Sequence, residues 1–428
     1  MDSFEDDFCG GPFWNYSLVW QSKQPDFTAC FQKTVLSWIP LAVIAILHIF
    51  EVPGYFSRTN KNRHILFNYY NITKLILTLS LIGINIAGLF YVYFVHLDGE
   101  GRNVYPADYL FEAAFLVSHL LSLGFLILSL RYGARSSYTQ FLYYFISTLC
   151  QAIIFRSFVV QNETSDTRFV LLTIHFGLSL CLLFSNCFAD RGPSKFDETL
   201  KDFQDGPEIS ASAPSKLTFI WVTGLIWKGL RNTLDVSMLW TLHPNLSSNG
   251  IFPIFSSFFD QVSVAVKDTR RQESAGDDEK SKNSKNVKTT ISVLPALFKT
   301  FGYEFFLGSF FQVIVVGMSI VNPQIQKAMI NYIAISEFDS NSYAFAWKGF
   351  MYAGLLLASS VFKSISNGQY NNKMYLVAMK VRTCLNSVIY RKSLKLSNTA
   401  RKESTVGQIV NLMQLDVSTI MVRYEYRK

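Results

Sequence analysis

Seven long apolar runs dominate the chain and limit the folds that it can adopt. A helix needs about 20 mostly apolar residues to cross the hydrocarbon core of a bilayer. Five runs fill the first half of the sequence and two follow in the second, at approximately Val35 to Phe50, Leu75 to Val95, Leu110 to Leu130, Phe141 to Val160, Phe169 to Phe188, Tyr303 to Val321 and Ala344 to Phe362. The pattern predicts an all-α integral membrane protein.

The composition agrees with this class. Charged residues make up 16% of the chain and hydrophobic residues 50%, whereas a soluble domain carries about 25% charged residues. The formal net charge of +8 could indicate nucleic-acid binding. The Lys and Arg residues, however, stand in blocks between apolar runs rather than on one basic face, so the expected partner is the lipid bilayer and not a nucleic acid.

The charges between the runs predict the topology. Basic residues gather at the first and third connections and after the fifth run, while acidic residues gather at the alternate ones; the basic set is Arg58, Lys61, Arg63, Lys74, Arg131, Arg135, Arg191 and Lys195. The positive-inside rule then places an extracellular or lumenal N-terminus at residues 1–34 and five spans in 35–189. The last two runs form a hairpin whose outer loop is expected from Asn322 to Tyr343.

The outer N-terminal segment holds Cys9 and Cys30, two of the six cysteines. We expect a disulfide between them, worth ~3 kcal/mol on the chain-entropy model; two free thiols at the membrane surface are the alternative. The sequons at Asn15 and Asn162 also fall on the outer side and are expected to be glycosylated. The sequons at Asn71 and Asn245 fall inside.

A long polar interval, residues 190–297, separates the fifth and sixth runs. Its part 267–290 has almost no apolar residue and is predicted to be a disordered, solvated linker. Upstream, Lys216 to Trp227 is apolar but too short to span, which favours an interfacial or re-entrant segment. A buried helix of a soluble subdomain is the alternative.

Chemistry-bearing motifs are absent from the sequence. Gly-Lys, which a P-loop requires, occurs nowhere, and neither H-E-x-x-H nor G-x-S-x-G is present. The histidines and cysteines form no metal-binding pattern. Glu112 and Arg156, both near the outer ends of their spans, are expected to pair or to snorkel. No catalytic, metal or cofactor site is therefore predicted in this chain.

The C-terminal part is predicted to be cytosolic and helical. The apolar spacing after the seventh run continues the helix, and Thr405 and Gln408 form a capping box that opens a short helix from Gly407 to Leu415. Two amphipathic helices joined by a turn would form a ledge that needs a partner domain to cover it.

Several blocks resemble one known family. They are DFTACFQKTVLSW (Asp26 to Trp38), SKLTFIWVTGLIWKGLRNTLDVSMLWTL (Ser215 to Leu242), LFKTFG (Leu297 to Gly302), NPQIQK (Asn322 to Lys327) and YRKSLKLSNTARKESTVGQIVNLMQLD (Tyr390 to Asp416). Together they resemble the multidrug-resistance-associated proteins, subfamily C of the ABC transporters. The resemblance implies an accessory five-span domain at 35–189, a cytosolic lasso linker at 190–297, and the first helix pair of a transport domain at 298–428.

The resemblance also implies functional residues. A coupling helix that docks on a nucleotide-binding domain would comprise Thr405, Val406, Gly407, Gln408, Ile409, Val410, Asn411, Leu412 and Met413. Phe311, Gln312 and Trp347 are the substrate-facing candidates. Family members often carry basic residues on this first transport helix, whereas Gln312 and Val315 stand at the equivalent positions here.

The implied function is ATP-driven export of amphipathic organic anions, drugs and glutathione or other conjugates, at the plasma membrane or a vacuolar or lysosomal membrane. ATP and Mg²⁺ would be bound by nucleotide-binding domains that this chain lacks, together with the second transmembrane domain. Residues 421–428 leave the family pattern, so the chain looks truncated. Two alternatives stay open: a channel-regulatory subunit of the sulfonylurea-receptor type, and a short isoform that acts as an interaction partner.

Overall fold

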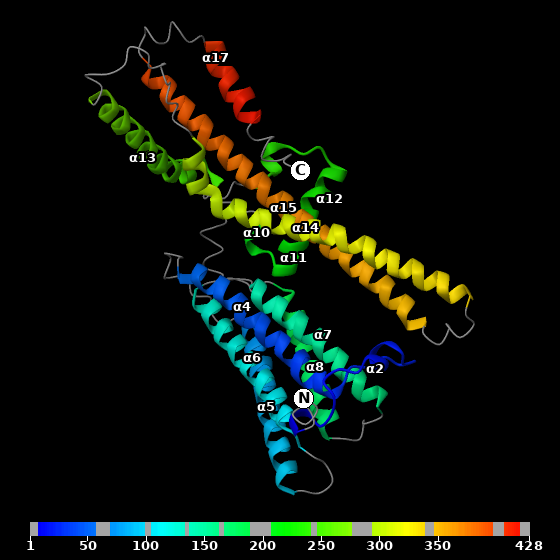
Figure 1. The fold of residues 1–428 in the computed structure, drawn as a ribbon. Helices are drawn as coiled ribbons and strands as arrows, with labels where there is room; N and C mark the ends of the chain where they lie inside the picture. The colour runs from blue at the N-terminus through cyan, green and yellow to red at the C-terminus, as the bar shows by residue number, and fades with distance from the viewer. Residues whose placement is uncertain are drawn as a thin grey trace. The chain divides into compact units, whose positions relative to one another are not determined.

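The computed structural model describes residues 7–56, 69–98, 104–132, 137–161, 167–188, 207–240, 246–275, 293–338, 346–396 and 406–419, and these contain helices and no strand. The chain divides into two compact units (Figure 1). The first comprises Met1–Trp240 with Ser336–Trp347, and the second comprises Thr241–Ile335 with Lys348–Lys428.

The first unit is built around five long helices, α4 (Ser37–Phe56), α5 (Tyr69–Asp98), α6 (Pro106–Arg131), α7 (Tyr138–Val160) and α8 (Thr167–Asn186). The short helices α2 (Tyr16–Trp20), α3 (Ala29–Phe31) and the π-helix η1 (Gln32–Leu36) precede them, and η1 runs directly into α4. Helix α5 packs against α6 and α8, and α7 packs against α4 and α8. The first five predicted apolar runs lie on η1 and these helices, apart from Cys187 and Phe188, which follow the end of α8.

The bundle is more polar inside than outside, as expected of helices in lipid. Large apolar side chains such as Ile49, Phe90 and Leu149 are exposed on its outer surface. Inside, the Ser118 hydroxyl from α6 lies 2.8 Å from the Tyr143 hydroxyl from α7. Small hydroxyls thus tie neighbouring helices together where lipid cannot reach.

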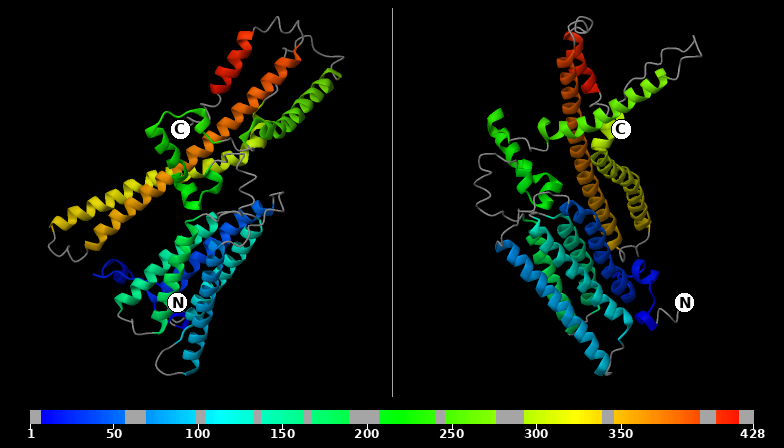
Figure 2. Two further views of the ribbon diagram at one scale, coloured as in Figure 1. Left: turned by 180° about the vertical axis from the view of Figure 1, so that it is seen from behind. Right: turned by 90° about the vertical axis from the view of Figure 1, so that its left-hand side faces the viewer.

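The second unit contains most of a hairpin of two very long helices, α14 (Leu294–Phe338) and α15 (Ala346–Lys395), with α13 (Ser248–Ala275) beside it; the ends of both helices within Ser336–Trp347 group with the first unit. Figure 2 shows α14 and α15 side by side in both views. Their contacts fix an antiparallel register. Lys380 Nζ donates to Glu304 Oε2 at 2.7 Å, and a Cβ on Gly349 would lie 3.1 Å from the Tyr332 ring.

This register corrects the predicted outer loop. Helix α14 continues past Val321 to Phe338, so most of the expected loop from Asn322 to Tyr343 is helical, and residues 339–345 lie outside the described part. Pro323 is contained within α14, which membrane helices tolerate because neighbouring groups satisfy the freed carbonyl. With 45 and 50 residues, α14 and α15 are about 68 Å and 75 Å long at 1.5 Å per residue. Both exceed a bilayer core of about 30 Å.

The linker between the fifth and sixth spans also contains helices. They are α10 (Pro207–Ser210), α11 (Ala213–Thr218), the 3₁₀-helices η2 (Ile220–Val222) and η3 (Val236–Met238), α12 (Thr223–Arg231) and α13. Residues 267–275, predicted to be disordered, form the end of α13. Their Lys, Arg, Gln and Glu residues are good helix formers, and Ile251 and Phe255 anchor the start of the helix in a core cluster. Residues 276–290 lie outside the described part.

Candidate functional sites

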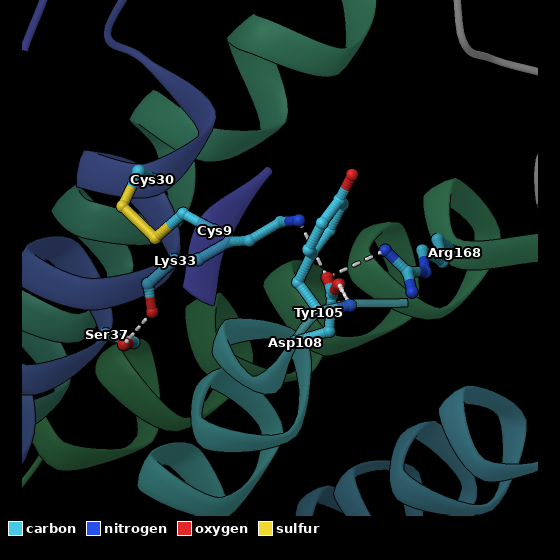
Figure 3. A network of polar contacts seen from close by, with 7 residues as sticks. All are labelled: Cys9, Cys30, Lys33, Ser37, Tyr105, Asp108 and Arg168. Carbon is cyan, nitrogen blue, oxygen red and sulfur yellow. Dashed lines mark hydrogen bonds and ion pairs between the residues drawn. A yellow bond between two sulfur atoms is a disulfide. The ribbon is translucent and has the colours of Figure 1, made fainter. Parts of the chain in front are cut away.

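A disulfide closes the N-terminal segment of the first unit. Cys9 and Cys30 are bonded with their Cα atoms 5.2 Å apart (Figure 3), the same pair that the sequence predicts. Gly10 follows Cys9 with a φ of +76°, and a Cβ there would lie 2.3 Å from the Tyr105 ring. The backbone therefore passes close to the start of α6 at a residue that only glycine suits.

Asp108 joins three helices next to this disulfide. Its Oδ1 lies 2.8 Å from Lys33 Nζ of η1 and 3.0 Å from Arg168 Nη1 of α8. Its Oδ2 accepts from the Tyr105 backbone N–H at 3.2 Å, which caps α6. Figure 3 shows the two basic side chains converging on this carboxylate. Only 4% of Asp108 is exposed, so one buried acid holds two cations.

A second carboxylate clamps the N-terminal segment to α7. Asp26 Oδ2 accepts from the Ser157 hydroxyl at 2.6 Å and from Gln161 Nε2 at 3.1 Å. Arg156 Nη1 donates to the Pro25 carbonyl at 2.6 Å. Of the two alternatives expected for Glu112 and Arg156, the direct pair is not formed, because Arg156 points to the N-terminal segment rather than towards α6.

A cavity of about 250 Å³ lies beside the Asp108 ion pairs within the first unit. Residues of η1, α5, α6, α7 and α8 line it, among them Lys33, Asn85, Glu112, Arg168 and His175. Asp108 is one of the acidic residues that the predicted topology places in the connection between the second and third runs, so the sequence did not predict this site. The four-residue spacing of Asp108 and Glu112, which places both on one face of α6, is the signal that could have found it.

The substrate-facing candidates do not come together. Phe311 and Gln312 are half-buried on α14, and Gln312 Oε1 is buried without a hydrogen-bond partner among the described residues. Tyr332, which marks the level of Gly349 on α15, lies twenty residues further along α14, or about 30 Å. Trp347, two residues before Gly349, groups with the first unit, where its Nε1 donates to the Ser22 carbonyl at 3.2 Å.

The predicted coupling segment forms α17 (Val406–Asn411) followed by the π-helix η6 (Leu412–Asp416), while Thr405 lies outside the described residues. Ile409 and Met413 are half-buried, and Val417, four residues further, is 3% exposed in the core cluster that includes Leu297 and Val381. The remaining side chains with a described environment are exposed; they are Gly407, Gln408, Val410, Asn411, Leu412, Gln414, Leu415 and Asp416. One face is thus anchored and the other is open.

Of the two expected glycosylation sites, Asn15 lies in the described part of the chain. Asn15 is exposed and caps α2, and its Oδ1 accepts from the Ser17 backbone N–H at 3.1 Å and from the Ser17 hydroxyl at 2.7 Å. The hydroxyl of its sequon is therefore already beside the amide that would be modified. Asn162 lies outside the described residues.

The short apolar stretch from Lys216 to Trp227 breaks into α11, η2 and the start of α12 at Phe219, whose φ is +61°. Ile226, Trp227 and Leu230 are exposed by 65%, 56% and 75%. The guanidinium of Arg231 lies 5.2 Å from the centre of the Trp227 ring. An exposed apolar face beside a tryptophan and an arginine is typical of a helix at the membrane interface.

No group of three or more His, Cys, Asp or Glu residues in the described part of the chain could hold a metal ion. Seven helices among the described residues are long and apolar enough to cross a membrane. The fold is therefore that of an all-α, multi-pass membrane protein, with a polar-cored bundle followed by a long helical hairpin. No family model matches the sequence.

Known proteins similar to this chain are ABC transporters of sub-family C, which confirms the resemblance stated above. Over 96% of its length the chain is 29% identical to ATP-binding cassette sub-family C member 3 of Homo sapiens. It is 26% identical over 97% of its length to member 2 of Homo sapiens, and 26% identical over 98% to member 2 of Rattus norvegicus. The chain spans 27% to 28% of the length of these relatives.

Proposed function

We propose that the chain supplies the accessory membrane bundle, the linker and the first helix pair of an ATP-driven exporter of the sub-family C type. The similarity over 96% of the chain carries this proposal. The open face of the coupling segment (α17 and η6) supports it, because exposed Val410, Leu412 and Leu415 suit docking on a nucleotide-binding domain. Such domains, which would bind ATP and Mg²⁺, and a second transmembrane domain are the partners required.

We infer that the transported molecules are amphipathic organic anions, drugs, and glutathione or other conjugates. Phe311 and Gln312 are the substrate-facing residues proposed on α14, where an aromatic ring and a side-chain amide could meet an amphipathic molecule. Trp347 stays a weaker candidate, since it groups with the first unit whereas Phe311 and Gln312 belong to the second.

The test is transport by the complete gene product in inside-out vesicles. We expect uptake of a radiolabelled glucuronide conjugate with ATP and none with AMP, and Gln312→Ala should lower it more than Gln326→Ala on the same helix. Vesicles that show no ATP-dependent uptake, from a protein that copurifies with an ion channel, would instead support a regulatory subunit of the sulfonylurea-receptor type.

A short isoform that acts as an interaction partner is the second alternative. An antibody against the linker, residues 190–297, separates it from the exporter on blots of native membranes. A band near 48.8 kDa supports the short form, and a band several times heavier supports the exporter.

We propose that the N-terminus is extracellular or lumenal, in the plasma membrane or a vacuolar or lysosomal membrane. The Cys9–Cys30 disulfide supports this side, since disulfides persist in oxidising compartments. Treatment with an N-glycosidase should increase the gel mobility of the native protein, and Asn15→Gln should remove part of that shift. Labelling of an N-terminal tag only in permeabilised cells, for a protein at the cell surface, would contradict this orientation.

A further inference from the structure

The cavity of about 250 Å³ in the first unit has no part in the export proposal. All the residues that line it come from the N-terminal segment and the five-helix bundle. Its wall combines aromatic rings, such as Tyr91, Phe111 and Phe115, with the charged residues around Asp108. Ligand pockets commonly have this combination of an apolar body and a few converging polar groups.

Glu112 is the charged residue of this wall that lacks a direct partner. It lies one helical turn after Asp108 on α6 and is largely enclosed. Among the described residues its carboxylate accepts no hydrogen bond and forms no ion pair within 4 Å; Arg168, which attracts it electrostatically, is paired with Asp108, as is Lys33. His175, 5% exposed, lines the same cavity with an Nε2 that also lacks a hydrogen-bond partner in the described part of the chain.

Gly88 of α5 makes room for this carboxylate. A Cβ on Gly88 would lie 2.6 Å from Glu112 Oε2 and 2.7 Å from its Cδ, closer than real Cβ atoms approach other heavy atoms. The Glu112 side chain therefore lies directly against the backbone of α5, and any larger residue at position 88 would displace it within the cavity.

Enclosing a carboxylate among helices in a bilayer is costly unless a hydrogen-bond donor or a cation meets it. The bundle meets this requirement for Asp108 and for Asp26 with side chains of its own. At Glu112 no donor among the described residues lies within hydrogen-bond distance, and the cation that attracts it, Arg168, is already paired with Asp108. A ligand that brings the missing donor would complete the site.

We propose that this cavity binds a primary amine attached to a small apolar or aromatic group, with Glu112 as the counter-ion of the ammonium. An ammonium group has three donors, one for the Glu112 carboxylate and others for neighbouring acceptors such as the Asn85 side chain. The aromatic rings of the wall accommodate the apolar group and attract the cation. A free amphipathic amine and the ethanolamine headgroup of a lipid share this chemistry.

The probe is radiolabelled 2-phenylethylamine, and propylbenzene is its uncharged match. Equilibrium dialysis against the full chain in detergent micelles measures binding above empty micelles. We expect saturable binding of the amine and only micellar partition of propylbenzene. Because the ion pair forms away from bulk water, Glu112→Gln should weaken amine binding about tenfold or more. Equal affinity of the amine for the parent and for Glu112→Gln would overturn the proposal.

Two glycine variants on α5 provide the matched control. Gly88→Ala pushes against the carboxylate and should weaken amine binding severalfold, whereas Gly83→Ala, whose Cβ would meet nothing within 4 Å, should leave it unchanged. Fluorescence-detected unfolding of each variant establishes that it is folded. If both glycine variants bind the amine equally well, or if the parent binds propylbenzene with the same saturable affinity as the amine, the cavity is not an amine site.

Lipid competition separates the two sources of the amine. In nanodiscs of phosphatidylcholine alone, 2-phenylethylamine should bind as in micelles. Displacement of the probe when phosphatidylethanolamine is added assigns the site to a lipid headgroup, and unchanged binding assigns it to a free amine. The site lies wholly in the first unit, so it can be tested whether or not the complete protein exports a substrate.

Discussion

The long helices of the first unit are more buried than those of the second. The most apolar stretches of the five bundle helices are 17% to 44% buried, compared with 11% for α14 and 6% for α15. The first unit closes its interior with its own hydroxyls, amides and ion pairs. The second unit has a compact core at one end, where Phe255, Leu297 and Val381 meet, and its apolar hairpin is open along most of its length.

This difference indicates which unit is stabilised by contacts within itself. Helices in lipid associate through close packing and interhelical polar contacts, because lipid is as apolar as leucine. The first unit has many such contacts, and the clearest in the hairpin is the pair of Lys380 with Glu304. We infer that the first unit folds around its own contacts, and that the exposed faces of α14 and α15 are suited to lipid or to further helices.

The distribution of tryptophan makes the two units separately observable. All seven tryptophans, Trp14, Trp20, Trp38, Trp221, Trp227, Trp240 and Trp347, belong to the first unit. Cys384, fully buried, is the one cysteine in the sequence range of the second unit. Tryptophan fluorescence therefore reports on the first unit, and alkylation of Cys384 reports on the second.

Loss of the Asp108 carboxylate should have the largest effect. Asp108→Asn leaves Lys33 and Arg168 without their shared anion in a largely buried site. Removal of one partner from a buried ion pair typically costs about 3–5 kcal/mol. We expect the tryptophan unfolding transition of the full chain in micelles to shift to much lower temperature, while the alkylation rate of Cys384 stays unchanged.

The matched control is the exposed ion pair of the second unit. Arg391 Nη1 lies 3.6 Å from Asp260 Oδ2, and both side chains are about half exposed. Such pairs contribute little to stability, so Asp260→Asn should change neither readout. If the Asp108→Asn variant is as stable as the Asp260→Asn variant, the buried ion pairs do not stabilise the first unit, and the inferred difference between the two units is wrong.

Reduction of the Cys9–Cys30 disulfide should have the next largest effect. The two cysteines are 21 residues apart, and closing a loop of this size is worth about 3 kcal/mol in the chain-entropy model. The double variant Cys9→Ser with Cys30→Ser should lower the tryptophan transition temperature and abolish its sensitivity to dithiothreitol. If dithiothreitol lowers the transition of the double variant as much as that of the parent, the reductant acts elsewhere.

Neighbouring glycines give a finer test of the same region. Gly10→Ala introduces a side chain at a positive φ and against the Tyr105 ring, while Gly11→Ala meets nothing within 4 Å. Backbone strain of this kind costs about 1–3 kcal/mol. The tryptophan transition of Gly10→Ala should fall clearly below that of Gly11→Ala, and equal transitions would show that the turn after Cys9 relaxes without cost.

The sequence could predict what depends on local pattern. Hydropathy was sufficient to locate the seven helices, because an apolar run of membrane length has few other folds available. The pairing of Cys9 with Cys30 could be anticipated because only these two cysteines precede the first span. Local pattern also misled at Asn322, where the sixth apolar run ends and a loop is expected, whereas α14 continues to Phe338.

The polar sites depend on contacts that no local pattern contains. Lys33, Asp108 and Arg168 are far apart in sequence, and their convergence follows from how η1, α6 and α8 pack. For the same reason Arg156, at the same depth as Glu112 in the predicted topology, could be assigned to the wrong partner. The depth of a residue in the membrane can be predicted from the sequence. The direction in which its side chain points around the helix depends on the packing of the whole bundle.

The smallest expected effect tests the anchor of the coupling segment. Val417 is 3% exposed and shares a cluster with Cys384, whereas Val410 is 42% exposed. Val417→Ala removes two buried methylene equivalents, worth about 1.6 kcal/mol, which should speed local opening and alkylation of Cys384 about fifteenfold. Val410→Ala should leave the rate unchanged, and neither variant should alter tryptophan fluorescence. If both valine variants speed alkylation equally, the anchored and open faces of the segment are not distinct, and the core at this end of the second unit is as loosely held as the rest of its hairpin.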